Sequence, residues 1–176
     1  IKTKVTLIGP SNKIKAFMDD LPDFGSSQIV VFAQSSQLIN LLAAEMDKHG
    51  HKYGIITGEV NPILRQEYMD SFQAGDLKYM LCTVGAGGTG ITLTAADTAV
   101  FLQRSWSLTD NLQAEARIRR IGSDIHESIN IIDYVSVDTI DSVVIEVVED
   151  KENLLQEILR DRELMKKVLE NNSARL

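Results

Sequence analysis

The chain has 176 residues, of which 44% are hydrophobic and 24% are charged, and this composition predicts one globular domain rather than a disordered segment. No apolar run approaches the length of a membrane span, and a single cysteine excludes an internal disulfide framework, so we expect an intracellular protein. Residues 133–163 contain ten acidic and three basic side chains, so this segment carries the whole net charge of −7. The rest of the chain is close to neutral and can present a local face that binds phosphate.

Short apolar runs rich in β-branched residues recur along the chain. Several of them are apolar throughout, as expected of parallel strands that are covered on both faces. They predict strands at Val5–Ile8, Ile29–Ala33, Tyr53–Thr57, Tyr79–Thr83, Ala99–Leu102 and Ile129–Val135.

Helical patterns lie between these strands. One covers Ser36–His49, and a second begins at Asn61 and Pro62, a capping residue followed by proline in the first turn, and stops near Gly75. A third begins after Ser107 and carries the arginines of QAEARIRRIGS. This order predicts an α/β fold with a doubly wound, mostly parallel sheet, whose ligands bind at the carboxyl ends of the strands.

A long acidic helix is predicted from about Thr139 to Leu169, because apolar residues recur there at helical spacing. We therefore divide the chain into a lobe over residues 1–150 and a helical extension over residues 151–176. Beyond Lys151, packing on this lobe and packing on a partner are both open.

A glycine-rich loop, TVGAGGTGITLTAAD, follows the strand at Tyr79–Thr83. Its glycines let the backbone turn sharply and bring N–H groups close to an anion. Gly85, Gly87 and Gly90 also spell the dinucleotide fingerprint, but that motif opens a helix and needs an acidic residue after the next strand. Neither condition is met, so a dinucleotide-binding enzyme is a disfavoured alternative, beside a tight loop that binds nothing.

Gln113, Arg117 and Arg120 are spaced i, i+4 and i+7, which places them on one face of a helix. A guanidinium matches phosphate oxygens two at a time, and an inserted arginine can neutralise charge as a γ-phosphate leaves. The basic face would consist of arginines alone: Arg104, Arg117, Arg119 and Arg120. The alternative is a solvated basic helix face that binds nothing.

The segment GAGGTGITLTAADTAVFLQRSWSLTDNLQAEARIRRIGS resembles the C-terminal RecA-like lobe of superfamily-two helicases, and within them the SWI/SNF-type double-stranded-DNA translocases. Upstream, IVVFAQSSQLINLLAAEM is similar to the fourth motif of that family, and the resemblance covers about residues 25–150. It implies a RecA-like fold and the second motor lobe of an ATP-dependent translocase or helicase. The binding partner would be double-stranded DNA, with RNA as an alternative.

The sequence has no G-x-x-x-x-G-K-S/T loop and no Asp-Glu pair. ATP and Mg²⁺ would therefore be held mainly by an N-terminal RecA-like lobe of the same protein, and this chain alone is expected not to hydrolyse ATP. No arrangement of histidines, cysteines and carboxylates predicts a metal site. A nucleic-acid or protein-binding module without catalysis is the other alternative.

The resemblance also implies roles for individual residues. Arg117 and Arg120 would reach the γ-phosphate, and Gln113 would line the same cleft. The nucleotide-binding loop would consist of Gly88, Thr89 and Gly90.

Contacts to the nucleic-acid backbone would come from Gln34, Ser35, Gly58, Thr83 and Trp106. Trp106 would project toward the DNA, with a buried core tryptophan as the alternative. The chain departs from the family at Gln103, where an acidic residue is usual, and at Arg119, where histidine is common. These departures predict a divergent member in the cytoplasm of a bacterium or of a virus-infected cell rather than in a eukaryotic nucleus.

Overall fold

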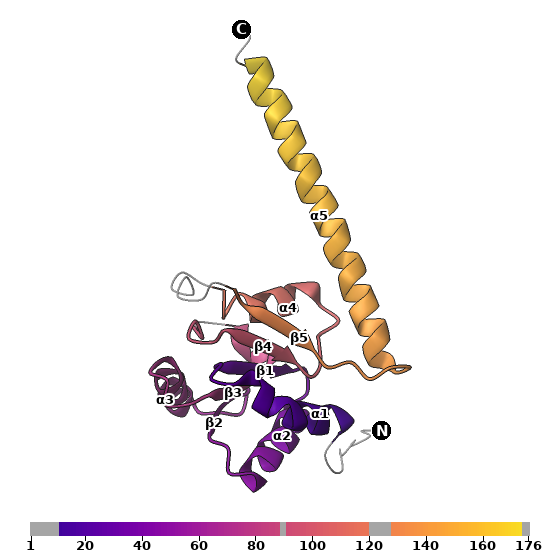
Figure 1. The fold of residues 1–176 in the computed structure, drawn as a ribbon. Coiled ribbons are helices and arrows are strands. Elements are labelled where there is room, and N and C mark those ends of the chain that lie inside the picture. Colours follow the sequence, from indigo (N-terminus) through magenta and orange to yellow (C-terminus); the bar gives the residue numbers. More distant parts are fainter. Residues whose placement is uncertain (1–10, 89–90, 120–127, 174–176) are drawn as a thin grey trace, which may run out of the picture.

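The computed structural model describes residues 11–88, 91–119 and 128–173, with side chains as far as residue 163. Five strands form one sheet in the order β2-β3-β1-β4-β5, and every neighbouring pair is parallel (Figure 1). The strands are β1 (Ile29–Ala33), β2 (Tyr53–Ile56), β3 (Tyr79–Thr83), β4 (Thr98–Phe101) and β5 (Asn130–Asp133). Five of the six expected strands are thus confirmed, and Val5–Ile8 lies outside the described residues.

Helices cover both faces of the sheet, as expected of a doubly wound fold. Residues that alternate along each strand point to opposite faces. Val31 and Leu81 pack with α1 (Asn12–Asp20) and α2 (Ser36–Lys48), together with the 3₁₀ helix η1 (Leu21–Phe24).

The other face is covered by α3 (Pro62–Gln73) and α4 (Leu108–Glu115). Phe32 and Phe101 stack there with ring centres 5.1 Å apart. The 3₁₀ helix η2 (Val84–Gly88) follows β3 and packs against α4.

Helices α1, α3 and α4 begin where a side-chain oxygen accepts a backbone N–H. Asn61 Oδ1 accepts from Ile63 at 2.8 Å, with Pro62 in the first turn, as the sequence predicts. Ser107 Oγ caps α4 in the same way. Ser11 Oγ caps α1, a helix that the pattern analysis did not predict.

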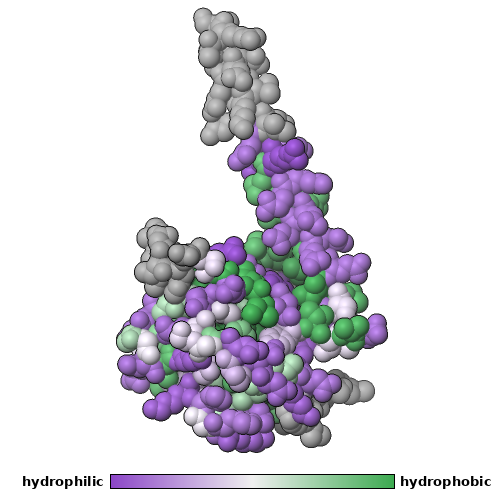
Figure 2. Space-filling model, viewed as in Figure 1, coloured by the Kyte–Doolittle hydropathy of each residue, from purple (hydrophilic) through white to green (hydrophobic). Residues whose placement is uncertain are grey.

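The long helix α5 (Ile140–Ser173) starts on the lobe and then leaves it (Figure 1). Its first turns are held by an ion pair between Asp141 and Lys13 and by the buried Val144 and Val148. From Lys151 onward every described side chain of α5 is exposed. The exposed apolar residues among them lie along an otherwise hydrophilic rod (Figure 2): Leu154, Leu155, Ile158 and Leu159.

In the part of the chain that the structure describes, no helix is apolar enough over sufficient length to cross a membrane.

Candidate nucleotide and nucleic-acid sites

A hollow of ≈ 340 Å³ lies at the carboxyl edge of the sheet, beyond β2, β3 and β1. Gln34 follows β1, Thr83 ends β3, and Gly58 follows β2 by two residues, and all three line this hollow. Because the three strands are parallel neighbours, their ends meet at one edge. The fold therefore brings together three residues that the resemblance assigned to nucleic-acid contacts.

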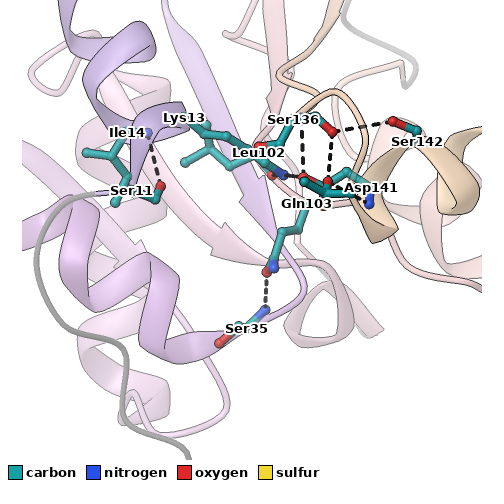
Figure 3. Close-up of polar contacts among 10 residues, drawn as sticks. Ser11, Lys13, Ile14, Ser35, Leu102, Gln103, Ser136, Asp141 and Ser142 are labelled. Carbon is teal, nitrogen blue, oxygen red and sulfur yellow. Dashed lines mark hydrogen bonds and ion pairs between the residues drawn. The ribbon is translucent and has the colours of Figure 1, made fainter.

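A second hollow of ≈ 190 Å³ lies beyond β1, β4 and β5. It is lined by Ser35 and Trp106, and Gln34 lines both hollows, so the two adjoin. The backbone N–H of Ser35 donates to Gln103 Oε1 at 3.3 Å (Figure 3). The amide that stands where the family usually has an acid thus holds the start of α2 against the end of β4.

Trp106 is 48% exposed, so the alternative of a core tryptophan is wrong. Its backbone is nevertheless fixed. Ser105 and the buried Asn111 exchange two hydrogen bonds of 2.9 Å, and Lys151 Nζ donates to the Trp106 carbonyl at 2.8 Å. Sequence reasoning did not identify Asn111 or Lys151 as supports of this segment, because neither belongs to a motif.

The arginine segment differs from the expectation of a continuous helix. α4 ends at Glu115, and in the turn beyond it the N–H groups of Arg117 and Ile118 form i→i−3 bonds to the carbonyls of Ala114 and Glu115, both at 3.1 Å. Gln113 is exposed within α4, whereas Arg117 lies in the tight turn beyond it and is partly buried. The prediction that one helix face carries both residues is therefore wrong.

The carbonyl of Arg117 accepts the N–H of Leu93 at 3.0 Å, which joins the arginine segment to the chain that follows the glycine loop. Gly88 ends η2, which packs against α4. Arg120, Thr89 and Gly90 lie outside the described residues. No helix begins between residues 91 and 97, which argues against the dinucleotide fingerprint.

Arg104 does not contribute to an open basic face, contrary to the expectation. Its side chain is only 11% exposed and pairs with Glu115 and Asp133 at 2.8 and 2.7 Å. Burial alone would lower its pKa, but hydrogen bonds to Asp133 and Glu115 outweigh that effect and raise it. Arg119 remains exposed.

Cys82 is a packing residue in the core, as the sequence indicates. It is buried within β3, and burial raises the pKa of its thiol, so the reactive thiolate is strongly disfavoured.

The sequence profile of the helicase conserved C-terminal domain matches residues 12–122, which include strands β1 to β4 and the arginine segment. The chain belongs to this helicase family. The match, together with SWI/SNF-type relatives, confirms the resemblance and the RecA-like fold.

The relatives of this helicase lobe include chromatin-remodelling proteins. It is 31% identical over 120 residues to the mouse chromodomain-helicase-DNA-binding protein 1-like, a match that covers 68% of this chain and 13% of that protein. It is 35% identical over 99 residues to the Arabidopsis chromatin-remodeling ATPase INO80, which covers 56% of this chain and 7% of that protein. The crystal structure of the C-terminal part of the Fun30 ATPase domain superposes with a TM-score of 0.71 at 22% identity, over 78% of this chain and 45% of that one.

The helicase lobe spans only a small part of the relatives' length, 13% and 7% of the two proteins above. The expectation of a bacterial or viral cytoplasmic protein is wrong, because the relatives come from mouse, human, chicken and Arabidopsis and several are named for chromatin, which is packed in eukaryotic nuclei.

Proposed function

We propose that this helicase lobe is the second motor lobe of an ATP-dependent translocase on double-stranded DNA. It would grip the nucleic-acid backbone and supply Arg117 and Arg120 to ATP, while an N-terminal lobe of the same protein would hold most of the ATP and Mg²⁺. Each round of binding and hydrolysis would close and reopen the cleft between the lobes and move them along the DNA.

The observation that carries the proposal is the shared position of Gln34, Ser35, Gly58, Thr83 and Trp106 along two adjoining hollows at one edge of the sheet. Short polar side chains and backbone N–H groups suit phosphate contacts, which position a nucleic acid without reading its sequence. The half-exposed ring of Trp106 on a fixed backbone suits stacking or wedging against the same strand.

The nucleotide side of the proposal is supported by the arrangement around Arg117. The bond from Leu93 to the Arg117 carbonyl joins the arginine turn to the chain just after the glycine loop. A rigid attachment suits a residue that must meet a phosphate from outside its pocket, because misplacement by about 1 Å can cost roughly a hundredfold in rate. Gln113, Gly88, Thr89 and Gly90 would complete this side of the cleft.

The part of α5 beyond Lys151 would brace the N-terminal lobe of the same protein. The exposure of Leu154 and Ile158, at 58% and 50%, supports a role outside this lobe.

The test is DNA-stimulated ATPase activity of the full-length protein, wild type against Arg120→Ala and Arg117→Ala. Loss of the arginine that reaches the γ-phosphate, the arginine finger, is expected to lower ATP turnover by about a thousandfold, with ATP binding retained. Lys48→Ala, which removes an exposed basic side chain from the C-terminal end of α2, is the matched control and should leave turnover unchanged.

Unchanged ATP turnover in both variants would refute the assignment of Arg117 and Arg120 as arginine fingers. DNA binding without any ATPase activity in the wild type would favour the binding module. Greater stimulation by duplex RNA than by duplex DNA would overturn the choice of double-stranded DNA.

A further inference from the structure

Arg104 is a largely buried arginine at the junction of β4, α4 and β5, and three of its guanidinium N–H groups are hydrogen-bonded. Its Nε and Nη2 donate to the two oxygens of Asp133 at 2.7 and 2.9 Å, and its Nη1 donates to Glu115 at 2.8 Å. The guanidinium carbon lies 4.0 Å from the centre of the Phe101 ring. Such a planar fork stacked on a ring can be reproduced by no other side chain.

The two acids occupy positions where regular structure ends. Glu115 is the last residue of α4, and its carbonyl accepts the N–H groups of Ile118 and Arg119, both at 3.1 Å. The position of Glu115 therefore sets the turn that carries Arg117. Asp133 ends β5 and is the parallel partner of Phe101 on β4. Arg104 thus fixes the end of α4 against the edge pair of strands.

Arg104 also lies next to the Trp106 segment in the chain. Ser105 lies between Arg104 and Trp106 and forms two hydrogen bonds with the buried Asn111. The backbone from Arg104 to Trp106 is therefore rigid, and a shift of Arg104 would also displace Trp106. One side chain consequently holds the proposed DNA-contacting segment on one side and the proposed ATP-contacting segment on the other.

We infer that Arg104 is a positioning residue that couples DNA contact at Trp106 to the placement of Arg117 at the nucleotide. The inference rests on the proposed function, and it assigns to Arg104 a role that does not involve contact with either ligand. Its two carboxylate partners take three of the five guanidinium N–H groups and neutralise its charge, which separates this role from that of a second finger.

Two variants of the full-length protein test the coupling. Arg104→Lys keeps the charge but replaces the fork by a single ammonium, which cannot hold both acids in the same geometry. The triple variant Arg104→Met, Glu115→Gln, Asp133→Asn removes the clamp without leaving a buried charge unpaired, so it is expected to fold. Lys48→Ala is again the matched control.

Both clamp variants are expected to lower DNA-stimulated kcat by about 10- to 100-fold, while the KM for ATP and the affinity for DNA change by less than about threefold. Hydrogen exchange at the amides of Arg117, Ile118 and Arg119 should become faster in both variants and stay unchanged in Lys48→Ala. Thermal unfolding of each variant separates loss of folded protein from loss of coupling.

Wild-type kcat and wild-type exchange in both clamp variants would refute the coupling alone. A lower melting temperature with an unchanged kcat per folded molecule would show that Arg104 only stabilises the fold. That result would also refute the coupling. Absence of DNA-stimulated ATPase activity in the wild type would instead refute the proposed function, and the coupling with it.

Discussion

Gly54 lies in β2, where the structure leaves no space for a side chain. A Cβ at this position would lie 2.8 Å from Met80 Sδ, 3.0 Å from Met80 Cε and 3.0 Å from Tyr68 Cβ. Ordinary contacts of this kind are about 3.5–4.0 Å, so the neighbours would have to move by roughly 0.5–1 Å. The end of Met80 can turn aside, but the Tyr68 Cβ is fixed to the backbone of α3.

Gly54→Ala is therefore expected to push α3 away from the sheet. Overpacking of this size costs about 1–3 kcal/mol, and the lower entropy of the unfolded alanine chain offsets about 0.4–1 kcal/mol of it. The net loss of unfolding free energy should be about 1–2 kcal/mol, seen as a lower urea midpoint with an unchanged slope.

The matched control is Gly58→Ala. A Cβ at Gly58 would meet nothing within 4 Å. This variant should unfold at the wild-type midpoint or slightly above it. A Gly54→Ala protein as stable as the wild type would refute the steric reasoning, because both glycines would then tolerate a methyl group equally.

Two further outcomes follow from the burial and charge of single side chains. Partial burial and a hydrogen bond with Asp47 raise the pKa of Tyr53 to about 12. Tyr53 loses its proton at a lower pH in the unfolded chain, so its contribution to stability is full below about pH 10 and is lost as the pH rises toward 12. Tyr53→Phe should therefore flatten the pH dependence of the urea midpoint between these values. A pH profile identical to that of the wild type would contradict this expectation. Trp106→Ala should cost less than about 1 kcal/mol of unfolding free energy, against about 3–5 kcal/mol for Phe32→Ala in the core, and equal losses in the two variants would mean that Trp106 packs as a core residue.

The sheet could be predicted from the sequence because buried parallel strands are continuous apolar runs. The expected bounds of β1 and β3 agree with the structure residue for residue. Helix α1 was not predicted, since its capping serine and its two buried residues, Ile14 and Phe17, form too short a pattern to stand out.

The arginine segment shows where local patterns fail. A spacing of four residues indicates a helix, but it carries no information about the bond from Leu93 that holds the Arg117 carbonyl outside one. Arg104 was grouped with an open basic face for a similar reason. Its partners, Glu115 and Asp133, lie 11 and 29 residues away, and only the fold brings them together.

At the end of β4, the structure explains one departure from the family pattern, the amide Gln103 in place of an acidic residue. Gln103 accepts a hydrogen bond from the Ser35 backbone, and this task needs an oxygen acceptor rather than a charge. An amide can therefore replace an acid at this position and still hold the start of α2.

The length of α5 has a mechanical consequence. Beyond Lys151, which bonds to the Trp106 carbonyl, the helix continues for 22 residues, a rod of about 33 Å at 1.5 Å per residue. A rotation of about 10° at Lys151 would sweep the far end through roughly 6 Å, given that helix rise. The helix is thus a lever arm, and small angular changes at the edge of the sheet become displacements of several ångströms at its tip (Figure 1).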